Sequence, residues 1–216
     1  PEHAQNEQGY KMLGTVSVLL RGLPFLYQGQ EIGMTNCRMT SIAEYDDIST
    51  KNEYANAIAA GCSEEEALEA CWRFSRDNAR TPMQWDASSN AGFTTGKPWL
   101  KVNPNYTAIN VADQTRKEDS VLNYYKKLIA LRKSETYREI FTYGDFKPLF
   151  ETEQNILAYE RCLDGKQIIV AANFGEGKHC LRSELFRNRT VLLSNETAAP
   201  VQDRLELLPS QVVVLA

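Results

Sequence analysis

Two arginines and an aspartate fall within five residues of the segment RFSRDNARTPMQWD, residues 73–86. Arg76 and Arg80 are four residues apart, so a helical turn places both side chains on one face. A guanidinium stays charged at any working pH and forms forked hydrogen bonds with a carboxylate or with vicinal hydroxyls. The pattern predicts either recognition of such a group or attachment of a long loop to its scaffold. Asp77 is expected to orient Arg76 or to cap the next turn.

The composition narrows the classes of function. The chain has 216 residues, 43% hydrophobic and 24% charged, which is typical of a globular protein that buries a core. A net charge of -4 does not favour nucleic-acid binding, and no apolar run is long enough to cross a bilayer. Five cysteines without a C-x-x-C pair favour free thiols in a reducing, cytoplasmic environment. With two histidines in the chain, we predict no metal site.

The N-terminal segment has the pattern of an α/β protein. Residues 5–21 are expected to form a helix, because apolar residues recur at helical spacing, and Gly22 ends it. Residues 23–33, LPFLYQGQEIG, show no alternation of polar and apolar side chains. This is typical of a strand that is covered on both faces in a parallel sheet. Helix, glycine, buried strand and polar loop in this order predict an α/β arrangement.

A long polar insert follows. Thr50 and Glu53 form a capping-box pattern for one helix, and Ser63 and Glu66 form the same pattern for a second. Residues 74–118 then show little periodicity. An irregular segment of this length is usually functional or disordered, and its aromatic content argues against disorder.

The pattern changes again near residue 133. Residues 120–133 carry the apolar stripe of an amphipathic helix. Beyond it, short β-rich runs separated by turn signals such as LDGK predict an antiparallel all-β domain. We therefore predict an α/β plus all-β chain with a boundary near residue 137, which gives domains of residues 1–136 and 137–216.

Four motifs resemble one enzyme family. SRDNARTPMQW followed by NAGFTTGKPWLKVNPNY resembles the oligo-1,6-glucosidase and α-glucosidase branch of glycoside hydrolase family thirteen. LPFLYQGQEIGMTN resembles the eighth strand of that family's barrel with its loop. VLNYYKKLIALRK resembles the eighth helix, and the β-rich tail resembles the C-terminal sandwich. The motifs cover nearly the whole chain in the family's order.

The resemblance implies the last part of a (β/α)8 barrel: the end of the seventh helix, the eighth strand, an insert and the eighth helix, followed by an antiparallel β-sandwich. The family's nucleophilic aspartate, acid/base glutamate and Asn-His-Asp string would then lie upstream of Pro1, since His3 is not followed by aspartate. The chain is expected to be the C-terminal part of an enzyme, inactive alone, whose partner is the missing N-terminal barrel. No catalytic residue is assigned to it.

A replacement pair of carboxylates is not evident. Retaining hydrolysis needs two carboxyl groups that flank the glycosidic bond. Asp46 and Asp47 are adjacent in sequence, so their side chains point in different directions. Residues 64–66 are three glutamates at a helix start, where the helix dipole explains them.

The resemblance also implies roles for individual residues. The position of Arg76 pairs with an aspartate from the N-terminal part of the barrel and hydrogen-bonds the non-reducing glucose, and Arg80 lies near the same pocket. Both arginines have the alternative role of locking the loop to the barrel. Gln28 and Glu31 lie at the C-terminal end of the barrel strand, where barrel active sites gather, and we interpret them as orienting the neighbouring loop.

One motif departs from the family. The pattern Tyr-x-Asp-(Val/Ile)-Glu usually follows the strand, and its glutamate lies near the outer sugar subsite. Here the corresponding string is YDDIS, residues 45–49, so Ser49 replaces the acid. Contacts at the outer subsite, and with them the linkage preference, are therefore in question.

The expected activity is that of a retaining exo-α-glucosidase on short α-linked oligosaccharides, mainly with α-1,6 bonds, without an organic cofactor. One alternative is a non-catalytic module from about residue 137 that binds glucan or shields the barrel. Its aromatic side chains are expected mostly to pack internally. Another alternative is a related trehalose-6-phosphate hydrolase or sucrose isomerase.

Overall fold

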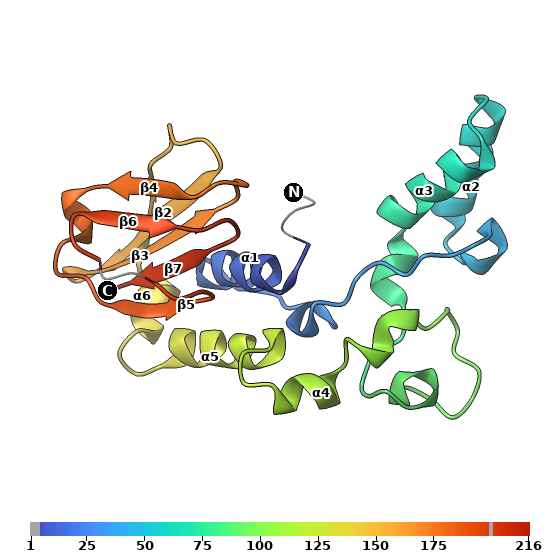
Figure 1. Cartoon of the computed structure of the whole chain (residues 1–216), viewed down its shortest axis with the longest axis horizontal. Helices are drawn as coiled ribbons and strands as arrows, with labels where there is room; N and C mark the ends of the chain where they lie inside the picture. Colours follow the sequence, from blue (N-terminus) through green and yellow to red (C-terminus); the bar gives the residue numbers. More distant parts are fainter. Residues whose placement is uncertain (1–4, 199–200) are drawn as a thin grey trace. The chain divides into compact units, whose positions relative to one another are not determined.

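The computed structural model describes residues 5–198 and 201–216. The chain forms two compact units. The first unit contains the described residues of Pro1–Glu31 and of Asp119–Ala216, and the second contains Ile32–Glu118. The chain therefore leaves the first unit after Glu31 and returns to it at Asp119 (Figure 1).

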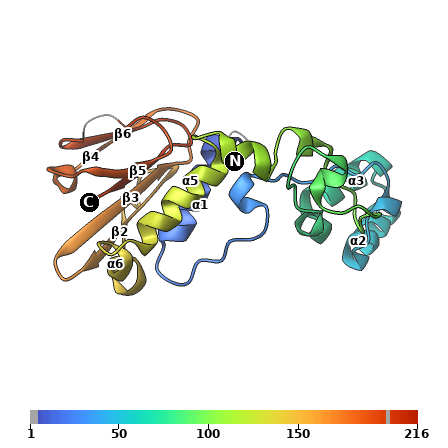
Figure 2. The ribbon, with the colours of Figure 1, turned by 90° about the horizontal axis from the view of Figure 1, so that it is seen from below.

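The described residues of the first unit form the α-helices α1 (Glu7–Leu19), α5 (Val121–Lys133) and α6 (Arg138–Tyr143). The side chain of Asn6 accepts a hydrogen bond from the Gly9 N–H and caps α1, and Ser120 caps α5 in the same way. Helices α1 and α5 pack along each other, as Figure 2 shows. The helices predicted over residues 5–21 and 120–133 are confirmed, with α1 shorter at both ends.

Antiparallel strands make up the rest of the first unit. A five-stranded sheet has the order β1-β2-β3-β7-β5, and β4 pairs with β6 in a second, two-stranded sheet. The β2–β3 hairpin pairs Ile156 with Asn173 and Leu163 with Lys166. Asp164 and Gly165 form its turn, both with positive φ, as a type I′ turn requires. The strands are β1 (Asp145–Leu149), β2 (Ile156–Leu163), β3 (Lys166–Asn173), β4 (His179–Arg182), β5 (Val191–Ser194), β6 (Arg204–Leu207) and β7 (Val212–Leu215).

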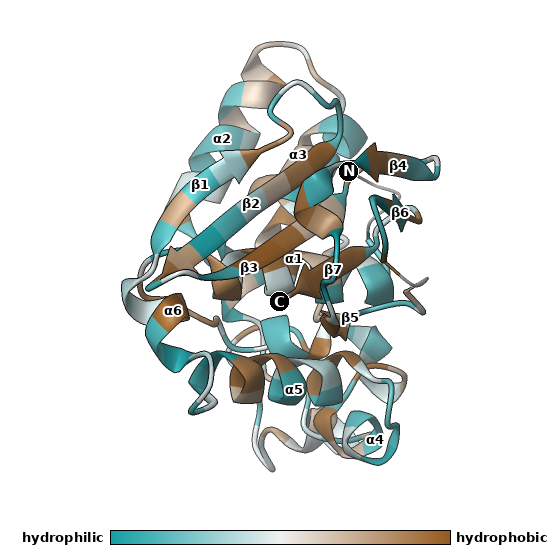
Figure 3. Ribbon diagram, turned by 90° about the vertical axis from the view of Figure 1, so that its left-hand side faces the viewer, coloured by the Kyte–Doolittle hydropathy of each residue, from teal (hydrophilic) through white to brown (hydrophobic). Residues whose placement is uncertain are grey.

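The five-stranded sheet is covered on both faces. Ile168, Val170 and Val214 pack with Met12 and Leu19 of α1 in one apolar cluster. Alternate residues of the same strands, such as Ile169 and Val213, pack on the other face. There they meet Leu181 of β4, Leu205 of β6 and Phe186 of the short 3-10 helix η7 (Glu184–Phe186). Because both faces are covered, β3 and β7 are nearly continuous apolar runs, visible as brown strands in Figure 3.

The strand predicted in residues 23–33 is not formed. Residues 23–27 have no regular secondary structure, and the side chains of Leu23 and Phe25 are 78% and 85% exposed. A parallel strand exists only when neighbouring strands bind its N–H and C=O groups, and no strand of residues 5–198 or 201–216 pairs with this segment. The barrel and sandwich assignments, and the domain boundary at residue 137, stay predictions.

The second unit is built from short helices and irregular chain around a small core. Cys37, Met39, Tyr45 and Cys71 are buried together there. Its elements are α2 (Ile48–Ala59), α3 (Glu64–Phe74), α4 (Val111–Arg116) and the 3-10 helices η3 (Ile42–Glu44), η4 (Arg76–Arg80), η5 (Ser89–Gly92) and η6 (Pro104–Thr107); η2 (Gln30–Ile32) lies where the two units join in sequence. Residues 74–118 are thus mostly irregular, as predicted.

One of the two predicted capping boxes is confirmed. Ser63 and Glu66 exchange hydrogen bonds at the start of α3. Thr50 is not the first cap, because α2 begins earlier: the carboxylate of Asp47 accepts the Thr50 N–H. An aspartate is a strong N-cap residue, so Asp47 starts the helix and places Thr50 inside it.

Candidate functional site

The two arginines of the opening motif lie on η4. Ser75 precedes this 3-10 helix and caps it, since its hydroxyl accepts the Asp77 N–H at 3.1 Å. A single tight turn therefore separates Arg76 from Arg80. Both side chains reach the same carboxylate, so the expectation that they share a face is confirmed.

That carboxylate belongs to Asp47, at the start of α2. Arg76 donates from Nη2 to Oδ1 at 2.6 Å and from Nε to Oδ2 at 3.3 Å, and Arg80 Nη1 lies 3.5 Å from Oδ1. The hydrogen bonds from Arg76 lower the pKa of Asp47 to about 2, and Thr50 contributes a further donor. The same contact raises the pKa of Arg76. The pair is therefore ionised at neutral pH.

Asp77 holds the backbone on which this carboxylate stands. Its side chain is fully buried, and its Oδ2 accepts the N–H groups of Asp46 at 2.7 Å and Asp47 at 2.9 Å. Its Oδ1 accepts a hydrogen bond from Arg80 Nη1 at 3.1 Å. Asp77 thus contacts Arg80 and not Arg76, and it acts on Arg76 through the position of Asp47.

Arg76 is well placed to bind a further group. Its side chain is 64% exposed, although its carboxylate partner is 5% exposed. Nε and Nη2 face Asp47, and Nη1 has no hydrogen-bond partner within the described parts of the chain. A guanidinium that is fixed on one edge presents its remaining donors in a defined direction, which suits a pair of hydroxyls or an anionic group.

Asp46 points away from this network. Its Oδ2 accepts the indole N–H of Trp99 at 2.8 Å, and its Oδ1 lies 3.8 Å from Lys51 Nζ. The two adjacent carboxylates therefore serve different partners, as their adjacency predicted. Sequence reasoning missed both Asp47 as the partner of Arg76 and the contact of Asp46 with Trp99. The local signal for the first was an aspartate directly before a helix.

Gln28 and Glu31 belong to the first unit, in the segment that does not form a strand. Gln28 is exposed, and Glu31 is half-buried in η2. Their neighbour Gln30 makes the connecting contacts, since it donates to Tyr125 Oη at 3.2 Å and accepts the Tyr27 N–H at 3.3 Å. The loop-orienting role of Gln28 and Glu31 stays a prediction.

The side chains from 5 to 198 and from 201 to 216 include no group of three His, Cys, Asp or Glu residues arranged to hold a metal ion. In the same residues, no helix has the length and apolar character needed to span a bilayer.

Comparisons with known proteins point to one family. The alpha amylase catalytic domain profile matches residues 2–144. An oligo-1,6-glucosidase of Parageobacillus thermoglucosidasius is 44% identical over 189 residues, which are 86% of this chain and 33% of that protein. An oligo-1,6-glucosidase of Bacillus cereus is 48% identical over 165 residues, 76% of this chain and 29% of that protein. The chain thus spans about a third of the length of these relatives.

Solved structures agree with the sequence relatives. The crystal structure of Bacillus licheniformis trehalose-6-phosphate hydrolase has a TM-score of 0.89 with 36% identity, and the match covers 97% of this chain and 38% of that one. The motifs, the structural likeness and the profile match lead to the same assignment. The chain belongs to the alpha-amylase family, glycoside hydrolase family thirteen, and is of the oligo-1,6-glucosidase type.

Proposed function

We propose that the chain is the C-terminal portion of a retaining exo-α-glucosidase that acts on short α-glucosides, chiefly those with α-1,6 bonds. The single observation that carries the proposal is the exposed guanidinium of Arg76, which Asp47 holds on one edge and leaves open on the other. The identity with oligo-1,6-glucosidases supports the choice of substrate.

Each residue has a defined part in this proposal. Arg76 binds hydroxyls of the terminal glucose and fixes its position in the pocket. Arg80 and Asp77 hold Asp47, which keeps the Arg76 fork in place. The acid/base and nucleophilic carboxyl groups, which must stand about 5–5.5 Å apart in a retaining enzyme, come from the N-terminal barrel of the same protein.

The cysteines support a cytoplasmic location for the proposed enzyme. Cys37, Cys62, Cys71, Cys162 and Cys180 are all free thiols. Free thiols of this number persist in a reducing compartment, which supports a cytoplasmic enzyme.

An activity assay tests the proposal. Hydrolysis of p-nitrophenyl α-glucoside and isomaltose is measured for the 216-residue chain and for the reading frame extended upstream of Pro1. We expect activity only in the extended protein. In that protein Arg76→Lys should lower kcat/KM by about 10- to 100-fold, because lysine cannot replace a forked contact that is worth about 1–3 kcal/mol.

A matched control tests whether the loss is specific to the position of Arg76. Arg73 is an exposed arginine on α3 that pairs with Glu69, and Arg73→Lys should leave kcat/KM unchanged. Activity of the 216-residue chain alone, or equal kcat/KM in the parent and Arg76→Lys proteins, would contradict the proposal.

A second candidate is trehalose-6-phosphate hydrolysis, favoured by the likeness to the Bacillus licheniformis enzyme of that name. Comparing kcat/KM of the extended protein for isomaltose and for trehalose 6-phosphate decides between the two substrates.

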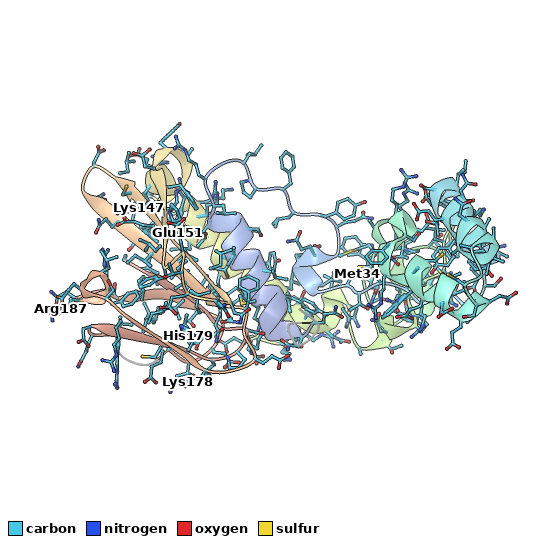
Figure 4. The ribbon with its side chains drawn as sticks, turned by 90° about the horizontal axis from the view of Figure 1, so that it is seen from above. Met34, Lys147, Glu151, Lys178, His179 and Arg187 are labelled. Carbon is cyan, nitrogen blue, oxygen red and sulfur yellow. The ribbon has the colours of Figure 1, made fainter. Side chains whose placement is uncertain are left out.

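A glucan-binding module in the β-rich region has less support. Tyr159 and Phe186 are fully buried, and Phe146 and Phe150 pack against them. Charged side chains such as Lys178 and Arg187 lie at the periphery of this region (Figure 4), and each is paired with a glutamate. A sugar-binding face needs exposed, coplanar aromatic rings instead.

A further inference from the structure

Trp99 is an exposed indole that is held in a fixed orientation. Its side chain is 67% exposed, yet its N–H, the one donor of an indole, is bound to Asp46 Oδ2 at 2.8 Å. A tryptophan that is exposed only because a loop is mobile has no such fixed partner. The ring faces therefore remain available while the edge is occupied.

The chain on the C-terminal side of Trp99 is anchored. Leu100 is 3% exposed, and Lys101 pairs with Glu44 at 2.9 Å. Asn103 then donates to the carbonyl of Thr35 at 3.0 Å. Because Leu100, Lys101 and Asn103 are each held in place, the backbone that carries the indole is fixed on its C-terminal side.

The anchor of Trp99 is joined directly to the anchor of Arg76. Asp46 holds the indole, and Asp47, one peptide bond away, holds the guanidinium. Asp77 accepts both backbone N–H groups of this dipeptide and fixes the two anchors together. Asp46, Asp47 and Asp77 therefore fix the position of the indole relative to the guanidinium.

We propose that Trp99 is a stacking platform for the second pyranose ring of an α-linked gluco-oligosaccharide whose terminal ring binds Arg76. This inference rests on the proposed function, which supplies the glucose at Arg76. The apolar face of a pyranose packs on an aromatic face, while hydroxyls at the ring edge stay hydrated. The platform distinguishes substrates of two or more rings from monosaccharides, and it offers an outer-subsite contact in a chain with Ser49 at the position of the family's acid.

A purely structural role makes a different prediction. If the bond between Trp99 and Asp46 only fastened the loop to the start of α2, removing the ring would change stability and leave sugar selectivity unchanged. Trp85 is the matched control, because it is another exposed tryptophan of the second unit. Asp46→Asn keeps an oxygen that accepts the indole N–H, whereas Asp46→Ala removes it.

The test is titration of the ¹⁵N-labelled 216-residue chain with glucose and with isomaltose, followed through the indole N–H signals of its three tryptophans. We expect isomaltose to shift the Trp99 signal and to bind about 3- to 10-fold more tightly than glucose, which corresponds to roughly 0.7–1.4 kcal/mol for one stacked ring. Trp99→Ala and Asp46→Ala should remove this advantage. Asp46→Asn and Trp85→Ala should retain at least half of it.

An unchanged ratio of isomaltose to glucose affinity in Trp99→Ala overturns the platform, as does an isomaltose titration that leaves the Trp99 signal unmoved. The proposed function is judged separately by Arg76→Lys and its effect on glucose affinity. Weaker glucose binding in Arg76→Lys with an unchanged ratio in Trp99→Ala supports the pocket and rejects the platform. The reverse pattern supports the platform and rejects the pocket role of Arg76.

Discussion

The carboxylate of Asp47 binds both Nη2 and Nε of Arg76, at 2.6 and 3.3 Å, and the same carboxylate caps helix α2 through the Thr50 N–H at 3.1 Å. The start of a helix and the direction of a guanidinium are thus set by one side chain. A change at Asp47 therefore reaches both the stability of the second unit and the presentation of Arg76.

Asp47→Ala and Asp47→Asn are expected to differ in stability. Asparagine is a good N-cap, so Asp47→Asn should keep the helix start and remove only the negative charge that pairs with Arg76. Alanine removes both, and we expect its melting temperature to fall further than that of Asp47→Asn by about 2–4 °C, the usual worth of one cap in a chain of this size. Circular dichroism melts measure the difference. Asp145→Asn, at an exposed aspartate of the first unit, serves as the control. Equal melting temperatures for the alanine and asparagine variants would contradict the capping role.

The acid sensitivity of the second unit should depend on Asp47. Its pKa in the folded chain is about 2, below the unfolded value near 3.9, because Arg76 and Thr50 stabilise the ionised form. The stabilisation is therefore fully present above about pH 4 and is lost as the pH falls through 2. Melting temperatures from pH 7 to pH 2 should show the parent chain above Asp47→Asn at neutral pH and the two curves converging in acid. If the two curves of melting temperature against pH stay parallel, the ion pair between Asp47 and Arg76 is not the cause of the acid sensitivity.

Glu44 should contribute a second acid-sensitive contact. Thr40 and Lys101 lower its pKa to about 2, so its stabilisation is also lost between about pH 4 and pH 2. Glu44→Gln is expected to reduce the fall in melting temperature between pH 4 and pH 2. Lys101→Met should reduce it less, since the hydrogen bond from Thr40 is the larger cause of the lowered pKa. If Lys101→Met reduced this fall as much as Glu44→Gln does, Lys101 and not Thr40 would be the main partner of the Glu44 carboxylate.

Gly14 in α1 should resist replacement by alanine. Alanine usually stabilises a helix interior by about 1 kcal/mol relative to glycine. Here a Cβ on Gly14 would lie 2.4 Å from Cζ of Tyr125, so the buried tyrosine ring or the two helices would have to shift. We expect Gly14→Ala to destabilise the chain by about 1–3 kcal/mol. Urea unfolding measures the change, and Gly177→Ala, which meets no atom within 4 Å, should be nearly neutral. Stabilisation by Gly14→Ala would show that the helices are not in close contact.

Arg161 should be among the most sensitive positions for stability. It is fully buried and donates to the carbonyls of Leu19, Phe141, Gly144 and Asp145 at 2.8–3.3 Å. Lysine cannot reach all four acceptors, so Arg161→Lys should cost about 3–5 kcal/mol through unpaired carbonyls and a poorly placed charge. Urea unfolding tests this, with the exposed Arg187→Lys as the control. A loss below about 1 kcal/mol would mean that water replaces the guanidinium.

Local patterns predicted the elements whose causes are local. The helices near residues 5–21 and 120–133, the Ser63 cap and the turn at Asp164 all depend on side chains within a few residues. Strand β4 carries no such local signal, because its sequence HCLR has no marked apolar pattern and its pairing comes from β6. The prediction of a strand in residues 23–33 failed for the opposite reason. The apolar pattern of this segment suits a strand, but a strand also needs neighbouring strands to pair with.

The candidate site shows the same limit. The spacing of Arg76 and Arg80 indicated a shared target, but Asp47 lies 29 residues before Arg76 in the chain. Asp46 and Trp99 are 53 residues apart. Sequence periodicity cannot predict such contacts, because they depend on how the insert packs around its core of Cys37, Tyr45 and Cys71.

The attachments of helix α1 also set an order of events during synthesis. Val16 receives its hydrogen bond from Tyr159, 143 residues later, and the Gln8 carbonyl receives one from Asn195, 187 residues later. At a translation rate of about 5–20 residues per second, α1 leaves the ribosome roughly 10–40 s before its last partner is made. Until β2, β3 and β7 have been made, Met12, Val16 and Leu19 lack the strand residues that cover them in the folded chain. The nascent chain is therefore a natural client for chaperones that bind short apolar helices, and its yield on expression should depend on them.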